Sequence, residues 1–476
     1  MKFDSFAFIS FCALAVASLR LVKPGMLRLL LVVMLNFVFV ASFFDSLRQA
    51  LPLAGFVMAG YAAVVLSSRI GASLPLIGVV ILIFAWLKRY DFLAFLPPLH
   101  FLYVVVGLSY ILFRVLHLVI DVGQKAIPRP GFISYLAYVL FFPTFVSGPI
   151  QRYEDFDGQV SSPVAPGTTH ELYMACQRII RGMALIGFVT VLTHFLFERI
   201  QLRFYGALAA STFSFSTFAL LCAAASLFAV HLYLNFGGYM DIVIGVGRLA
   251  GLALPENFNR PYLSRNFLEF WSRWHITLSE WFKFYLFNPL LRLMAQKWRA
   301  PSQMPYLAVL GFFVTFTVMG IWHGSTRIFL AYGLILGSGI SLNKLYQVQM
   351  TAWLGKKGYK VLAGRSWYGH LCRGLTLAYF ALSIVCLWID ASHAQVLSRF
   401  RGMALVFIAF AALSALTAVL SFAIERLTAR LSNVPPWMPS LSDRVLPAWT
   451  AIQIFLVAVA IFSVDSNSPE FVYKVF

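Results

Sequence analysis

Long apolar stretches recur along the whole chain, and they restrict its possible folds more than any other feature of the sequence. Each runs for about 17 to 25 residues, and a helix of that length crosses the roughly 30 Å of hydrocarbon in a bilayer. The runs of Leu, Val, Ile and Phe do not alternate with polar residues as the strands of a membrane barrel do. With 60% hydrophobic and 12% charged residues, the sequence predicts an all-α polytopic membrane protein.

About fourteen apolar segments are candidate spans, and about eleven of them are expected to cross the membrane. The segments are 4–20, 27–44, 50–67, 74–90, 98–120, 133–150, 176–198, 213–236, 238–253, 305–322, 327–346, 374–391, 402–424 and 446–464. Segment 133–150 contains Pro143, Gly148 and Pro149, so a broken, re-entrant element is as good an interpretation as a clean span. No internal repeat is evident, and we expect a single domain over residues 1–476.

The first segment also resembles a secretory signal peptide, because it ends in Ala15-Val16-Ala17. Asp4, so near the start, weakens that reading, and we interpret the segment as the first transmembrane helix.

The formal net charge is +19, but Lys and Arg punctuate apolar segments instead of forming one patch. Such flanking charges set topology and contact anionic lipid headgroups, so we expect membrane lipid as a partner and no nucleic acid. Basic residues place the first short loop and the connection 344–373 in the cytoplasm, whereas Lys88 and Arg89 fall on the opposite side by counting. Orientation therefore stays open. The five cysteines show no paired spacing and predict no disulfide framework.

Two histidines stand where a bilayer makes ionisable groups costly. His323 follows the apolar run 307–322, between Gly320 and Gly324, and His275 lies in the aromatic and charged stretch 267–284. We expect that stretch to form an amphipathic helix at the interface, or one that enters the bundle part-way. An intramembrane histidine is a functional candidate by default, and a neutral imidazole suits proton removal near neutral pH. The other interpretation is a buried histidine that only hydrogen-bonds a neighbouring helix.

Asp241 follows Leu234-Asn235-Phe236-Gly237-Gly238-Tyr239-Met240 in another apolar run, so it must be paired, protonated or part of a site. A structural pairing is the favoured interpretation, with Arg248, Arg260 or Arg273 as the expected partner. His231 lies on the same stretch and is a weaker candidate for a cavity residue. We expect no metal site, because neither His-x-x-x-His spacing nor nearby carboxylate ligands appear beside His275 and His323.

Several stretches together resemble the membrane-bound O-acyltransferase (MBOAT) family, in the bacterial branch that acylates envelope polymers. They are Pro255-Glu256-Asn257-Phe258, Phe270-Trp271-Ser272-Arg273-Trp274-His275-Ile276-Thr277-Leu278-Ser279, and Met319-Gly320-Ile321-Trp322-His323-Gly324. Phe142-Pro143, Ser147-Gly148-Pro149-Ile150, the Gly-Tyr-x-Asp turn ending at Asp241, and the aromatic C-terminal tail are also similar. Apart from the tail, the motifs lie within 135–345, and Ser325-Thr326-Arg327 depart from the family pattern.

The resemblance implies an MBOAT fold, with transmembrane helices accompanied by re-entrant and interfacial elements. It also implies that His323 is the catalytic base and His275 the second catalytic residue. Substrate contacts are expected at Trp322, Arg273, Trp274, Asp241 and Asn257.

The function implied is acyl transfer, of acetyl in the first place, from a cytoplasmic thioester to hydroxyls of an extracytoplasmic polysaccharide or envelope polymer. The donor would be acyl-coenzyme A or an acyl-phosphopantetheine carrier protein, with no tightly bound cofactor. The expected partner is an extracytoplasmic acyltransferase or the glycan acceptor, and the expected location is the bacterial inner membrane. A transporter or flippase for an envelope precursor is the alternative, but it predicts inverted repeats that the sequence lacks. A catalytically silent scaffold is a third possibility, and only a test of His323 separates it from an enzyme.

Overall fold

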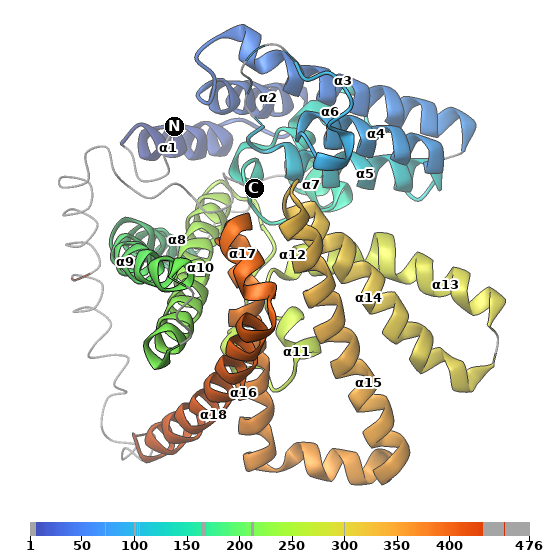
Figure 1. Ribbon diagram of the computed structural model, residues 1–476. Helices are drawn as coiled ribbons and strands as arrows, with labels where there is room; N and C mark the ends of the chain where they lie inside the picture. The colour runs from blue at the N-terminus through green and yellow to red at the C-terminus, as the bar shows by residue number, and fades with distance from the viewer. Residues whose placement is uncertain are drawn as a thin grey trace. The chain divides into compact units, whose positions relative to one another are not determined.

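The computed structural model describes residues 6–71, 73–99, 101, 103, 105–162, 168–210, 214–298, 300–431 and 452. Across this described part the chain is helical and contains no strand, and its one isolated β-bridge joins Phe258 to Trp274 (Figure 1). The all-α prediction is therefore confirmed.

Backbone contacts divide the chain into two compact units. The first holds Ile452 and the described residues of Met1–Val189 and Asn235–Glu256, and the second holds those of Thr190–Leu234 and Asn257–Ala451. This division does not test the expectation of one domain over 1–476, which stays a prediction.

Eight helices of the first unit precede residue 190. They are α1 (Phe6–Leu21), α2 (Met26–Ala41), α3 (Leu47–Ile70), α4 (Ser73–Leu87), α5 (Leu108–Gly123), α6 (Phe132–Val139), α7 (Tyr153–Ser161) and α8 (Thr169–Ala184). Short 3₁₀ turns at Asp91–Leu93 and Phe142–Thr144 and a π-helical turn at Leu185–Val189 complete this set. Helices α3, α4 and α5 pack against one another, and α2 packs on α6 (Figure 1).

The second unit contains α9 (Thr190–Ala209), α11 (Phe267–Trp271), α12 (Ile276–Phe282), α13 (Asn288–Lys297), α14 (Met304–His323), α15 (Arg327–Gly364), α16 (Ser366–Ser383), α17 (Ala391–Ser398) and α18 (Phe400–Leu431). It also has 3₁₀ turns at Pro261–Leu263, Pro301–Gln303 and Ile384–Leu387 and a π-helical turn at Lys283–Phe287. Helix α10 (Phe215–Leu249) begins in this unit and ends in the first. Helix α14 packs along α15, and α16 packs along α18 (Figure 1).

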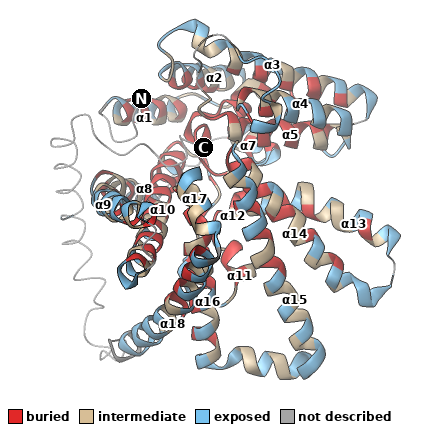
Figure 2. Ribbon diagram, viewed as in Figure 1, coloured by how far each residue is buried: buried red, intermediate tan, exposed pale blue. Residues whose placement is uncertain are grey.

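Seven helical stretches of the described chain are long and apolar enough to cross a membrane. They are Leu47–Ile70, Thr169–Ala209, Phe215–Leu249, Pro301–His323, Arg327–Gly364, Ser366–Leu387 and Arg401–Leu427, and four shorter apolar helices accompany them. The last stretch has a mean hydropathy of 2.5 over a window of which only 22% is buried, and exposed residues colour much of α18 in Figure 2. Phe407 and Val419 on α18 are 72% and 64% exposed, which suits a surface that faces lipid. The chain is a multispanning membrane protein, while the number of crossings stays a prediction.

The predicted segments 213–236 and 238–253 are wrong as two spans, because they form the single helix α10. The expected Gly-Tyr-x-Asp turn is wrong for the same reason, since Gly238 lies inside the helix. Gly238 instead allows two helices to pack closely. A Cβ on Gly182 of α8 would stand 2.5 Å from the carbonyl oxygen of Gly238, and one on Gly238 would stand 3.0 Å from the Cβ of Leu185. Glycines at these positions let the two helices touch backbone to backbone.

The stretch 133–150 is broken, as one of its two interpretations predicted: α6 is only eight residues long, and the turn Phe142–Thr144 follows it. Buried side chains satisfy the backbone groups exposed by the break. Arg114 of α5 donates to the carbonyl oxygens of Val139 at 2.8 Å and Thr144 at 2.7 Å. Asn36 of α2 accepts from the backbone N–H of Phe142 at 2.8 Å. Irregular backbone is tolerated here because protein groups replace water.

Other predicted spans differ mainly at their ends. The segment predicted from 98 starts as a helix only at Leu108, behind Gly107 at φ +78°. Helix α15 continues past the predicted 346 to Gly364, with a non-helical residue at Gly355. Segment 446–464 falls outside the described residues apart from Ile452, and the aromatic tail 468–476 falls wholly outside them.

Candidate functional site

His323 is the last residue of α14, and Gly324 ends the helix. The imidazole is 5% exposed, and its ring centroid lies 4.8 Å from that of Trp322 and 5.6 Å from that of Tyr332 on α15. The flanking glycines allow this arrangement. A Cβ on Gly320 would lie 2.1 Å from the Cα of Gly333, so α14 and α15 meet backbone to backbone one turn before the histidine. The sequence thus places an imidazole at a helix end, inside protein. Its catalytic role stays a prediction.

His275 is 1% exposed and has a left-handed backbone, with φ +46°. Such a conformation is strained for a residue with a Cβ and persists only where neighbours enforce it. Here the segment that begins at Asn257 pairs with the one that ends at Ile276. The N–H of Asn259 donates to the carbonyl oxygen of Arg273 at 2.9 Å, and that of Ile276 donates to the carbonyl oxygen of Asn257 at 3.0 Å. This pairing breaks the expected single amphipathic helix into α11 and α12, so that prediction is wrong.

The side chain of Asn257 fixes the tautomer of His275. Its Oδ1 accepts from the backbone N–H of Thr277 at 3.1 Å and from the Thr277 hydroxyl at 3.0 Å. A backbone N–H is only a donor, so the amide oxygen must face this way. The same oxygen lies 3.3 Å from His275 Nδ1, which must therefore carry the proton. The lone pair of the neutral imidazole is then on Nε2.

The two histidines influence each other. Burial lowers the pKa of His275 well below its ordinary value of 6.5, and the nearby His323 lowers it further. An isolated imidazolium is costly to bury, so His275 is neutral in the folded protein near neutral pH. The second unit therefore holds two buried imidazoles close enough to interact electrostatically, one of them with a defined basic nitrogen.

Arg273 and Trp274 lie next to His275 but are occupied by other partners. Arg273 pairs with Glu269 at 2.9 Å, one turn earlier in the chain. Trp274 is 4% exposed and stacks on Phe270, with ring centroids 5.7 Å apart, while Phe380 packs on it at 4.8 Å. These contacts support the loop that holds His275. Direct substrate contact by either residue stays a prediction.

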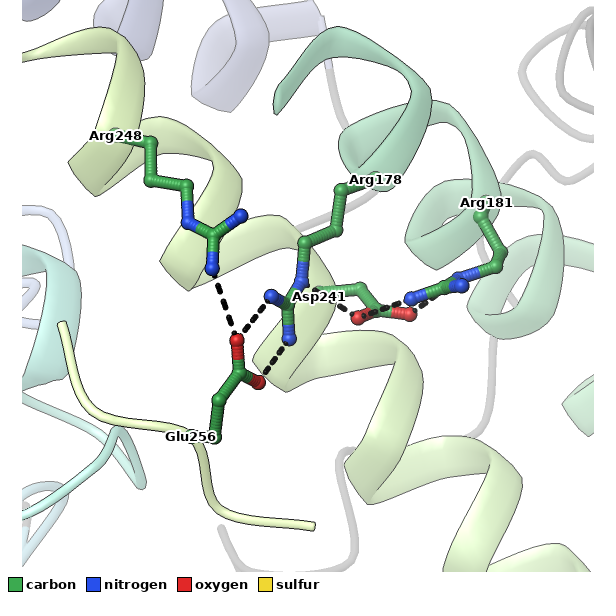
Figure 3. A network of polar contacts seen from close by, with 5 residues as sticks. All are labelled: Arg178, Arg181, Asp241, Arg248 and Glu256. Carbon is green, nitrogen blue, oxygen red and sulfur yellow. Dashed lines mark hydrogen bonds and ion pairs between the residues drawn. The ribbon is translucent and has the colours of Figure 1, made fainter. Parts of the chain in front are cut away.

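Asp241 belongs to the first unit, where it joins a network with three arginines and Glu256 (Figure 3). Its Oδ1 accepts from Arg178 at 2.8 Å, and Arg181 donates to both carboxylate oxygens, at 2.7 and 2.8 Å. The expected partners of Asp241 were wrong, because the two arginines of α8 take this role. Arg248 instead donates to Glu256 at 3.0 Å.

Arg178 also donates to Glu256, through both of its terminal nitrogens at 2.5 Å (Figure 3). Burial alone would raise the pKa of Glu256, but the hydrogen bonds of Arg178 and the charges of Arg178, Arg248 and Arg181 outweigh it. The pKa therefore lies below its ordinary value. The sequence analysis missed Arg178, Arg181 and Glu256. The three-residue spacing of two arginines, which places both on one face of α8, was the available signal.

His231, the weaker candidate, is 2% exposed and its Nδ1 lies 3.0 Å from the Thr193 hydroxyl. Among the described residues no group of three or more His, Cys, Asp or Glu side chains is placed to hold a metal ion. The expectation of no catalytic metal stays a prediction.

A polytopic helical membrane protein with two interacting buried histidines, one ending a helix and one held in a strained loop, is the class that fold and site define. The sequence profile of the membrane-bound O-acyltransferase family matches residues 63–381, and the chain belongs to that family. The predicted family resemblance is therefore confirmed.

Two relatives in the bacterial branch illustrate the match. The teichoic acid D-alanyltransferase of Bacillus subtilis (strain 168) is 30% identical over 246 residues, which are 50% of this chain and 58% of that protein. The probable alginate O-acetylase AlgI of Pseudomonas aeruginosa is 27% identical over 242 residues, 50% of this chain and 42% of that protein. The chain thus spans about half the length of the curated relatives that it matches.

Proposed function

We propose that this protein is an O-acyltransferase of the bacterial inner membrane that moves an acyl group from a cytoplasmic thioester towards hydroxyls of an extracytoplasmic polysaccharide or envelope polymer. The observation that carries the proposal is the pair of buried, interacting imidazoles at the family's two histidine positions. Acyl transfer to a hydroxyl uses a neutral imidazole as its base. His323, the proposed base, is buried, and burial keeps the nearby His275 uncharged, so that it can orient the acceptor.

In the proposed reaction His323 takes the proton of the acceptor hydroxyl while the oxygen attacks the thioester carbonyl. The carbon–sulfur bond then breaks, and the leaving thiolate receives the proton from His323. His275 presents the lone pair of Nε2, which suits it to accept a hydrogen bond from the acceptor hydroxyl and to orient it. Asn257 is the positioning residue for this step, because its amide oxygen holds the proton of His275 on Nδ1.

The names of the relatives guide the choice of substrates. They describe D-alanyl transfer to teichoic acid and O-acetylation of alginate. We propose acetyl as the first group to test, with coenzyme A or a phosphopantetheine carrier protein as its donor. A second, extracytoplasmic acyltransferase or the polymer itself would receive the group.

The test measures ester content of the cell envelope and exopolysaccharide in cells that express wild type, His323→Ala or His275→Ala at equal membrane levels. His194→Ala is a matched control, because that histidine pairs with Glu198 on α9. The proposal predicts that ester content collapses with His323→Ala, falls with His275→Ala and stays normal with His194→Ala. Unchanged ester content in both site variants would contradict the catalytic assignment and favour the transporter alternative.

A further inference from the structure

A second cluster of chemically competent side chains lies in the second unit, where α16 packs along α18. His370 of α16 contacts two residues of α18. Its Nδ1 lies 2.7 Å from the Ser421 hydroxyl, and its Nε2 lies 3.0 Å from a carboxylate oxygen of Glu425. A hydroxyl, an imidazole and a carboxylate are thus linked in the order used by serine nucleophiles.

The hydrogen-bond donors in this chain follow from chemistry. An ionised carboxylate only accepts, so His370 carries its proton on Nε2, towards Glu425. In the neutral imidazole Nδ1 then has the lone pair and accepts from the Ser421 hydroxyl. Arg373 donates to the Ser421 oxygen from the other side, and an arginine cannot accept. The only proton that Ser421 can give is therefore directed at His370, which is the arrangement that activates a hydroxyl for attack.

Comparison within α18 shows that Ser421 departs from the usual behaviour of a helical serine. Ser414 donates its hydroxyl to the carbonyl oxygen of Phe410 at 2.7 Å, four residues back, as helical serines commonly do. The hydroxyl of Ser421 instead bonds outside its own helix, to His370 and Arg373 on α16. Ser421 is also only partly buried.

Arg373 supplies a further element of a nucleophilic site. Beside its bond to Ser421, it donates to the carbonyl oxygen of Leu263 at 3.3 Å, while its buried Nε has no partner in the described part of the chain. A cationic N–H next to the attacking oxygen is the kind of group that stabilises negative charge on a carbonyl oxygen.

We propose that Ser421, His370, Glu425 and Arg373 form a second nucleophilic site, at which Ser421 accepts an acyl group from a thioester. The Ser421 oxygen bonds to the carbonyl carbon as its proton passes to His370 Nδ1. The carbon–sulfur bond breaks, and the thiolate takes that proton, so the products are an ester on Ser421 and a free thiol. The choice of a thioester donor rests on the proposed function, whereas the nucleophilic character of Ser421 does not.

The test treats the purified full chain in detergent with an alkyl fluorophosphonate, which phosphonylates activated serines and loses fluoride. Peptide mapping of the wild-type chain locates the label, and this readout needs no variant. Labelling is expected at Ser421 and not at Ser414. His370→Gln should slow it by about a hundredfold or more and Glu425→Gln by about tenfold, since general bases contribute about that much. Thermal unfolding confirms that each variant is folded, and Ser414→Ala is the matched control.

Incubation with acetyl-coenzyme A then tests acyl transfer itself, with the acetyl ester on Ser421 as the expected product. His323→Ala separates the two proposals, because it should lose envelope esters and still be phosphonylated at Ser421 like wild type. A folded wild-type chain without label at Ser421 would overturn the second site and leave His370 and Glu425 as a link between two helices. Equal labelling of wild type and folded His370→Gln would also overturn it. Labelling without acetylation would overturn the acyl-accepting role alone.

Discussion

The loop around His275 and the network around Asp241 stabilise buried polar side chains in opposite ways. His275 lies against the uncharged amide of Asn257, which also accepts from Thr277, and burial keeps the imidazole neutral. The carboxylate of Asp241 accepts hydrogen bonds from Arg178 and Arg181 on both of its oxygens (Figure 3). Each region is described within its own unit.

The difference separates chemistry from architecture. The hydrogen bonds of a fully paired charge are all made to its neighbours. Removing one partner therefore leaves the remaining buried charges uncompensated. A buried neutral imidazole whose tautomer is fixed by a neighbour has a defined basic nitrogen, which is the kind of group that general-base chemistry uses. We therefore expect changes in the first region to alter catalysis and changes in the second to alter stability.

The largest expected effect follows from removing the shared carboxylate. Asp241→Ala leaves Arg178 and Arg181 facing each other with one of their acceptors gone, and it should cost about 3 kcal/mol. Thermal unfolding in detergent, followed by size-exclusion chromatography, measures the loss. Activity per folded molecule should match wild type. A folded variant with wild-type stability and lost activity would instead make Asp241 a substrate-contacting residue.

Asn257→Ala should reduce activity by about tenfold or more, because outer-shell partners of a functional histidine commonly contribute this much. Asn257→Asp is a sharper variant. A carboxylate beside His275 favours the imidazolium, so the acid limb of the pH–activity profile should move to higher pH. Asn259→Ala is the control, since Asn259 contributes backbone groups to the same pairing. If Asn257→Asp left the profile in place, the tautomer argument would fail.

Stability should fall with pH on the acid side because of His275. Its pKa is lowered in the folded protein, so below about 6.5 the unfolded chain binds a proton that the folded chain does not. The stabilisation is complete above pH 6.5 and decreases as pH drops towards the folded pKa. The unfolding temperatures of wild type and His275→Gln are measured from pH 7.5 downward. That of wild type should fall more steeply below about pH 6.5 than that of His275→Gln. The same pH dependence in both proteins would show that another group dominates.

The smallest effect is expected for Arg273→Ala. Both side chains of the pair with Glu269 are about a third exposed, and such ion pairs contribute about 0.5 kcal/mol. Activity should change little if the guanidinium only braces the loop. A large rise in KM for the donor with unchanged stability would instead support the prediction that Arg273 contacts the substrate.

The sequence predicted the helical class, the family and the two histidines, because hydropathy and local motifs carry those signals. It could not predict the left-handed backbone of His275, which depends on pairing between residues 257–259 and 273–276. The sequence also predicted a turn at Gly238. A glycine that permits close contact between helices and one that permits a turn cannot be told apart from the sequence alone. The partners of Asp241 lie about sixty residues earlier in the chain, where spacing gives no guidance.

The central claim is that His323 acts as the base in acyl transfer. The most direct measurement follows radiolabelled acetyl from thioesters of coenzyme A and of a phosphopantetheine carrier into the polymer of membrane vesicles, with wild type or His323→Ala as the only acyltransferase of this family. The account predicts that the rate with His323→Ala falls by about a hundredfold or more while donor binding is retained. Equal rates from folded wild type and folded variant would contradict it.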